Sequence, residues 1–155
     1  MEATVGHPAP VFSLPDETGR QWNLSDWHGQ KRVLLVFYAA DFNPVCAGEM
    51  DLIGSLAADF MAENTVVAAI SCDNTYCHQE FKRRKGQYIP FLSDFWPHGE
   101  VARAYGVFDH QLGMSRRGAF LIDEHGVIID TLVRDISAGR PVDDWRALLD
   151  KARAA

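Results

Sequence analysis

Long apolar segments and a cysteine-rich framework are missing from this chain, and its first ten residues lack the pattern of a leader sequence. The longest uninterrupted apolar run, Val33 to Ala40, has eight residues, whereas a membrane-spanning helix needs about 20. The three cysteines are too few, and odd in number, to form a structural disulfide framework. Residues 1–10 contain no basic segment followed by an apolar run, so we expect no secretory signal and a cytoplasmic location.

Excess positive charge and glycine-rich phosphate loops are also missing. The formal net charge is −6, which argues against the basic footprint of a nucleic-acid-binding protein. Basic residues cluster only at Lys82–Lys85, and we interpret this cluster as the solvated face of a helix. Neither a Walker nor a Rossmann fingerprint occurs. We therefore expect no cofactor and no nucleic-acid or membrane partner.

The hydrophobic pattern predicts one α/β domain over residues 1–155. Turn-forming residues dominate the first thirty positions and indicate short, irregular strands. The rest predicts buried strands at 32–38 and 65–71, helices at 46–62, 76–85 and 100–104, hairpin strands at 119–122 and 127–129, and a last helix with Pro141 in its first turn. This order is that of the thioredoxin-like fold, with a central mixed sheet flanked by helices and an N-terminal strand extension.

Cys46 stands where a buried strand and a polar turn are followed by helical periodicity. The N–H groups in the first turn of a helix lack intrahelical partners, and together with the helix dipole they favour an anion. A cysteine at this position is therefore a candidate thiolate nucleophile. The alternative is that Cys46 is a small buried apolar residue, as most free cysteines are. Its position alone leaves both interpretations open.

Four segments resemble the peroxiredoxin family, most closely its one-cysteine, alkyl hydroperoxide reductase E type. Residues 37–49, FYAADFNPVCAGE, resemble the peroxidatic loop with its motif P-x-x-x-T/S-x-x-C. Residues 90–99 and 104–108 are similar to a later stretch of that type, and residues 117–123, RGAFLID, to the strand with the motif R-G-x-F-x-I/V-D. Residues 5–14 match the opening strand. The resemblance covers the chain from residue 5 to about residue 150.

The resemblance implies a catalytic role for several residues. Cys46 falls on the peroxidatic cysteine, whose thiolate attacks the peroxide O–O bond and becomes a sulfenic acid. Arg117, rather than its neighbour Arg116, falls on the arginine that holds the thiolate and orients the peroxide. Glu49 falls on the glutamate that orients this arginine. The alternative for Glu49 is an acid favoured by the first turn of a helix.

Two positions depart from the family motif. Asn43 replaces the threonine or serine, and Ala39 replaces the proline. An asparagine amide can both donate and accept hydrogen bonds, as a hydroxyl can, but it is longer and planar. Our main hypothesis is a thiol peroxidase that reduces hydrogen peroxide or organic hydroperoxides. One alternative is a related enzyme whose Cys46 attacks a different electrophile, and another is a redox sensor.

The other cysteines lead to expectations about partners. Cys77 is a possible resolving cysteine, and the alternative is a bystander near a helix start. Cys72 is interpreted as a packed residue and His78 as a residue on the helix surface. The spacing of these three residues is not a zinc pattern, so we expect no metal. The resemblance further implies a homodimer and a thiol reductant, which can be thioredoxin, a glutaredoxin-like protein or a low-molecular-weight thiol.

Overall fold

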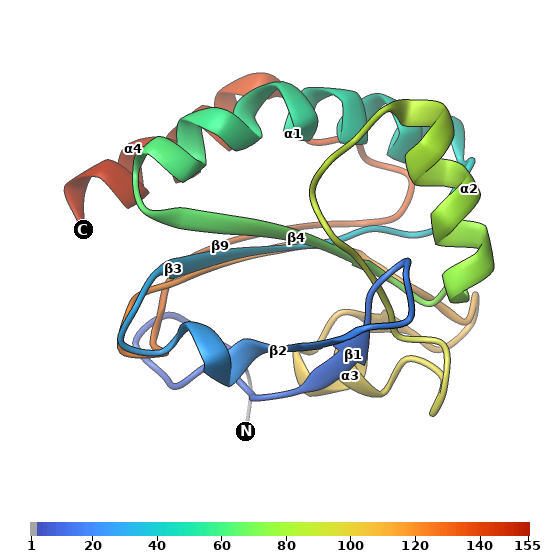
Figure 1. The fold of residues 1–155 in the computed structure, drawn as a ribbon, viewed down its shortest axis with the longest axis horizontal. Helices are drawn as coiled ribbons and strands as arrows, with labels where there is room; N and C mark the ends of the chain where they lie inside the picture. The colour runs from blue at the N-terminus through green and yellow to red at the C-terminus, as the bar shows by residue number, and fades with distance from the viewer. Residues whose placement is uncertain (1–2) are drawn as a thin grey trace.

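A five-stranded mixed sheet forms the centre of the computed structural model, which describes residues 3–155 (Figure 1). In spatial order its strands are β5 (Phe91–Ser93), β4 (Thr65–Ser71), β3 (Arg32–Phe37), β8 (Arg117–Ile122) and β9 (Ile128–Arg134). Strands β3, β4 and β5 run parallel, whereas β8 and β9 are antiparallel to their neighbours. The predicted mixed sheet is therefore confirmed, with the short strand β5 as an addition that the hydrophobic pattern did not indicate.

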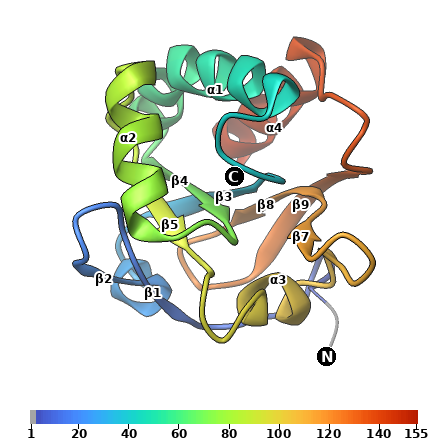
Figure 2. The same ribbon diagram turned by 90° about the vertical axis from the view of Figure 1, so that its right-hand side faces the viewer.

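Helices and hairpins cover both faces of this sheet (Figures 1 and 2). The long helices α1 (Pro44–Ala62), α2 (Thr75–Lys85) and α4 (Val142–Ala154) cover one face. The other face is covered by the hairpin β1 (Ser13–Pro15)–β2 (Gln21–Asn23), the 3₁₀ turn η1 (Leu24–Trp27) and helix α3 (Glu100–Ala104). A small hairpin, β6 (Phe108–Asp109)–β7 (Met114–Ser115), precedes β8. Within residues 3–155, no helix is long and apolar enough to cross a membrane.

Two apolar cores, one on each face, explain why β3 is apolar at successive positions. Leu34 and Val36 belong to the core under α1, α2 and α4. Leu35 and Phe37 belong to the core on the opposite face. Because side chains of a strand alternate between the faces, a strand buried on both sides must be apolar throughout.

The helix starts differ slightly from the predicted ones. Helix α1 begins at Pro44 rather than at Cys46, since proline suits the first helical position, where its missing N–H has no partner to lose. Cys46 is therefore the third residue of α1 and lies in its first turn. Pro141 was predicted inside the last helix, but it is the capping residue immediately before α4. Both shifts are within two residues and leave Cys46 at a helix N-terminus.

Candidate active site

Cys46, Glu49 and Arg117 meet at one end of the sheet. Cys46 lies in the first turn of α1, and Glu49 follows one turn later, so both side chains project from the same side of the helix. Arg117 is the first residue of β8, which lies beside β3 in the sheet below α1. The exposed fractions are 0% for Cys46, 5% for Glu49 and 0% for Arg117. The three residues that the resemblance singled out thus form one buried cluster.

The Arg117 guanidinium is fixed against the sulfur of Cys46. Its Nη1 donates to Cys46 Sγ at 3.0 Å and to Glu49 Oε1 at 2.8 Å. Its Nε donates to the carbonyl oxygen of Ile136 at 2.7 Å. Its Nη2 is buried and has no acceptor among the described residues. Since buried donors are rarely left unpaired, this amino group is available to a substrate oxygen.

Arg140, which sequence reasoning missed, completes the cluster from the loop before α4. Glu49 Oε2 accepts from the backbone nitrogen of Arg140 at 2.9 Å and from its Nε at 2.8 Å, while Nη2 donates to Glu49 Oε1 at 3.0 Å. The guanidinium lies 4.7 Å from the centre of the Trp145 ring, and burial lowers the pKa of Arg140. A single loop arginine 91 positions from its partner has no local pattern by which it could be found.

Asn43 uses its side-chain oxygen to cap helix α1. Asn43 Oδ1 accepts hydrogen bonds from the backbone nitrogens of Val45 at 3.0 Å and Cys46 at 3.2 Å. These are two of the N–H groups that a helix start leaves without partners. The cap uses the oxygen alone and does not use the amide nitrogen Nδ2, which is the donor of this side chain. Ala39, at the position where the motif has proline, is 1% exposed and packs in the same core as Cys46.

We predict that Asn43→Ala lowers the free energy of unfolding by about 1 kcal/mol, because the cap is lost, whereas Asn43→Asp keeps an acceptor and the stability. Urea denaturation measures both effects. Asn74→Ala is the matched comparison, because Asn74 Oδ1 caps α2 in the same way by accepting from the Cys77 nitrogen at 2.9 Å. It should lower the free energy of unfolding by a similar amount. Equal losses in Asn43→Ala and Asn43→Asp would show that the capping contact is not what stabilises α1.

Buried polar contacts hold the loop before α1. Asp41 accepts from the Tyr38 hydroxyl at 2.6 Å, its second oxygen lies 2.7 Å from His78 Nδ1, and its backbone nitrogen donates to Asp73 at 2.8 Å. Burial, followed by the charge of Asp41, raises the pKa of Tyr38, which keeps this hydroxyl a donor. The expectation that His78 lies on the helix surface was wrong. It is fully buried, and its Nε2 lies 2.9 Å from the Leu92 carbonyl oxygen.

Phe42 has a strained backbone within the same loop. Its φ is 66°, in the left-handed region that non-glycine residues rarely adopt. Its ring packs 5.2 Å from the Phe81 ring and 5.4 Å from the Arg84 guanidinium, measured between ring centres and from the Arg84 Cζ atom. Contacts with α2 therefore hold the segment that delivers Asn43 and Cys46 to the site.

Cys77 and Cys72 lie outside the cluster around Cys46 and, like Cys46, are free thiols. Burial, followed by the charges of Asp41 and Asp73, raises the pKa of Cys77 to about 12. Burial is also the main cause that raises the pKa of Cys72 to about 12.

One ligand atom each of Asp41, Asp73 and Cys77 lie within 4.8 Å of one another. We assign no metal to this group, since both carboxylates already accept hydrogen bonds.

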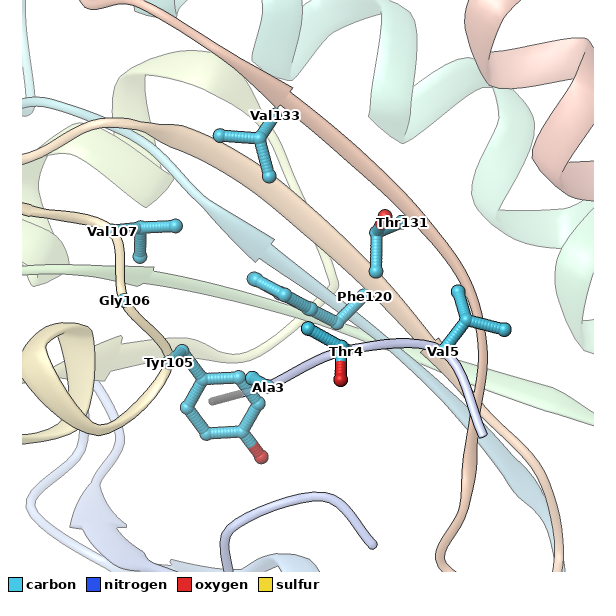
Figure 3. Close-up of a pocket in the computed structure, with 9 residues that line it drawn as sticks. All are labelled: Ala3, Thr4, Val5, Tyr105, Gly106, Val107, Phe120, Thr131 and Val133. Carbon is cyan, nitrogen blue, oxygen red and sulfur yellow. The ribbon is translucent and has the colours of Figure 1, made fainter. Parts of the chain in front are cut away.

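A cavity of about 330 Å³ lies on the face of the sheet opposite Cys46 (Figure 3). Phe120, Thr131 and Val133 of strands β8 and β9 line it together with Tyr105. Arg117 cannot reach this cavity, because side chains at odd and even positions of β8 project to opposite faces. The cavity has no charged residue in its described lining and is not part of the site.

Comparisons with known proteins agree on one family. The model of the AhpC/TSA family matches residues 5–131. Alkyl hydroperoxide reductase E of Mycobacterium tuberculosis is 40% identical over 80% of this chain and 81% of its own length. Thioredoxin peroxidase of Echinococcus granulosus is 36% identical over 97% of this chain and 81% of its length. The crystal structure of Peroxidoxin BcpB from Mycobacterium tuberculosis is 27% identical and matches with a TM-score of 0.86, over 99% of this chain and 98% of that chain. The predicted thioredoxin-like fold is confirmed by such neighbours.

Proposed function

The chain belongs to the AhpC/TSA family of peroxiredoxins, and we propose that Cys46 performs its peroxidase chemistry. Family membership makes the protein a thiol-dependent peroxidase, an oxidoreductase that reduces peroxides. One observation supports the assignment of Cys46 above all others. The guanidinium of Arg117 donates to Sγ at 3.0 Å inside a fully buried cluster, as expected for a sulfur that reacts as a thiolate.

In the proposed first step, the Cys46 thiolate attacks one oxygen of a hydroperoxide ROOH. The O–O bond breaks as the S–O bond forms, so the sulfur is oxidised to a sulfenic acid. The leaving RO⁻ takes up a proton and departs as ROH. Arg117 Nη2 and the Asn43 amide nitrogen donate to the peroxide oxygens while negative charge develops on the leaving oxygen. Glu49 and Arg140 act as positioning residues, because they hold Arg117 without touching the peroxide.

We propose that an external thiol reduces the sulfenic acid of Cys46. The candidate reductants are thioredoxin, a glutaredoxin-like protein and a small thiol. The alternative is that Cys77 resolves the sulfenic acid by forming a disulfide with Cys46. The raised pKa of Cys77 argues against this alternative, since a thiol attacks as its thiolate. We also propose a homodimer and a cytoplasmic location, the latter supported by the three free cysteines.

The decisive experiment treats the reduced protein with one equivalent of hydrogen peroxide and follows Cys46 by stopped-flow fluorescence and mass spectrometry. We expect a sulfenic acid on Cys46, formed faster than on free cysteine thiolate, in the wild type and in the Cys77→Ala control. Cys46→Ser should abolish the reaction. A rate no better than that of free cysteine would remove Cys46 as the peroxidatic residue and favour a different electrophile. A Cys46–Cys77 disulfide would instead establish Cys77 as the resolving residue.

A further inference from the structure

A cavity beside the start of α1, which we call the site mouth, has a volume of about 410 Å³. Its described lining consists of Asn43, Val45, Asp109, Leu112, Asp135, Ile136 and Ser137. Asn43 and Val45 belong to the cap and first turn of α1 around Cys46, and the carbonyl of Ile136 accepts from Arg117. The site mouth therefore borders both the turn of α1 that carries Cys46 and the loop that holds Arg117.

The charge at the site mouth comes from two aspartates. Among the described residues that line it, Asp109 and Asp135 are charged and both are acidic. When Cys46 is an uncharged sulfenic acid, the state that the reductant meets, the cluster beneath carries one formal positive charge, because Arg117 and Arg140 exceed Glu49 by one. This single positive charge offsets one of the two negative charges at the rim and leaves the other.

Both aspartates are placed so that an approaching molecule meets their charge. Asp109 is held in position, since its Oδ1 accepts from the backbone nitrogens of Gln111 and Leu112 at 2.9 Å each. The Asp135 side chain is 83% exposed, and its partner Arg116 lies at 3.8 Å, a long and solvated ion pair. Such an exposed pair neutralises little of the field of the carboxylate.

We propose that the site mouth is the route by which a thiol reaches Cys46, and that it selects the reductant by charge and favours a thiol without negative groups beside its sulfur. This inference rests on the proposed function of Cys46. In the step concerned, a reductant thiolate attacks the sulfur of the Cys46 sulfenic acid. An S–S bond forms, the S–O bond breaks, and the departing hydroxide takes up a proton and leaves as water. A second thiol then releases Cys46 and is oxidised to the disulfide of the reductant.

Electrostatics sets the expected size of the effect. A cleft lined by charge of one sign changes the encounter rates of charged molecules by about 10–10³-fold, and the effect falls steeply with ionic strength. With two aspartates at the open rim, we expect the lower end of this range. The Debye length is about 30 Å at 0.01 M salt and about 3 Å at 1 M, so the selection should disappear in concentrated salt.

Three small thiols test the inference by stopped-flow reduction of the Cys46 sulfenic acid. The thiolates of cysteamine, 2-mercaptoethanol and 3-mercaptopropionate have net charges of zero, minus one and minus two. Each rate is expressed per thiolate and divided by the rate of the same thiolate with a small uncharged disulfide. At about 0.01 M ionic strength we expect cysteamine to react about tenfold faster than 3-mercaptopropionate, and at about 1 M less than twofold faster.

The double variant Asp109→Asn/Asp135→Asn should reduce the low-salt rate ratio to about twofold, because it removes both negative charges from the site mouth. Asparagine at position 109 keeps the oxygen that accepts from the turn, so the local structure is preserved. Asp150→Asn is the matched control: it removes one acidic charge from a side chain of α4 that is 75% exposed, and it should keep the wild-type ratio. An unchanged ratio in the double variant, or no preference in the wild type, would overturn the inference.

Hydrogen peroxide is uncharged, so normal oxidation of Cys46 with no preference among thiols refutes the inference alone. If Cys46 is not oxidised at all, the proposed function is wrong and the inference falls with it.

Discussion

Replacing Arg117 with lysine should slow the oxidation of Cys46 by hydrogen peroxide by about 10²–10³-fold, the usual effect of losing one placed donor. The guanidinium of Arg117 reaches Cys46 Sγ, Glu49 and the Ile136 carbonyl at once, and it retains Nη2 for the substrate. Lysine keeps the positive charge, but its ammonium cannot reproduce this planar fork. Stopped-flow kinetics over a range of peroxide concentrations measures the second-order rate constant.

Arg116→Lys is the matched control for this variant. Arg116 is the preceding residue, and its side chain is 38% exposed, against 0% for Arg117. We expect a rate within about twofold of the wild type, since surface substitutions away from a site have small effects. Circular dichroism shows whether Arg117→Lys remains folded. If folded Arg117→Lys keeps the wild-type rate, the guanidinium does not stabilise the transition state.

Replacing Glu49 with glutamine should lower the free energy of unfolding by about 3–5 kcal/mol, as removal of one member of a buried ion pair does. Glu49 accepts hydrogen bonds from Arg117 Nη1 and from the backbone nitrogen, Nε and Nη2 of Arg140. Its removal leaves two buried guanidinium groups with the Cys46 sulfur as their one anionic partner. Glutamine has nearly the same shape, so a cavity does not contribute to the loss. Urea denaturation at neutral pH measures the effect.

Glu63→Gln provides the comparison for Glu49→Gln. Glu63 pairs with Arg153 at 3.3 Å, but the two side chains are 34% and 50% exposed, and such a pair contributes about 0.2–1 kcal/mol. If Glu49→Gln loses no more stability than Glu63→Gln, the cluster does not depend on the carboxylate. A large loss of stability together with slower oxidation of Cys46 would indicate that Glu49 both stabilises the fold and orients Arg117.

Elements with a strong hydrophobic pattern were predictable, and elements without one were not. The strand over 32–38 is apolar at successive positions because both faces of β3 are buried. Strand β5, by contrast, has three residues, too few for a pattern to be recognised. Strand β9 includes the polar residues Asp130 and Thr131, which concealed its length. Helix ends moved by one or two residues, because caps at Asn43 and Pro141 depend on backbone angles.

The sequence by itself determined the order of the elements, the position of Cys46 at a helix start and, through the family motifs, Arg117 and Glu49 as its partners. Periodicity and motifs are local, so they can be read along the chain. Only the tertiary structure placed Arg140 on Glu49, buried His78 against Asp41 and set Asp109 and Asp135 at the site mouth. These contacts join residues that are far apart in sequence, and such contacts depend on how the elements pack, which no local pattern records.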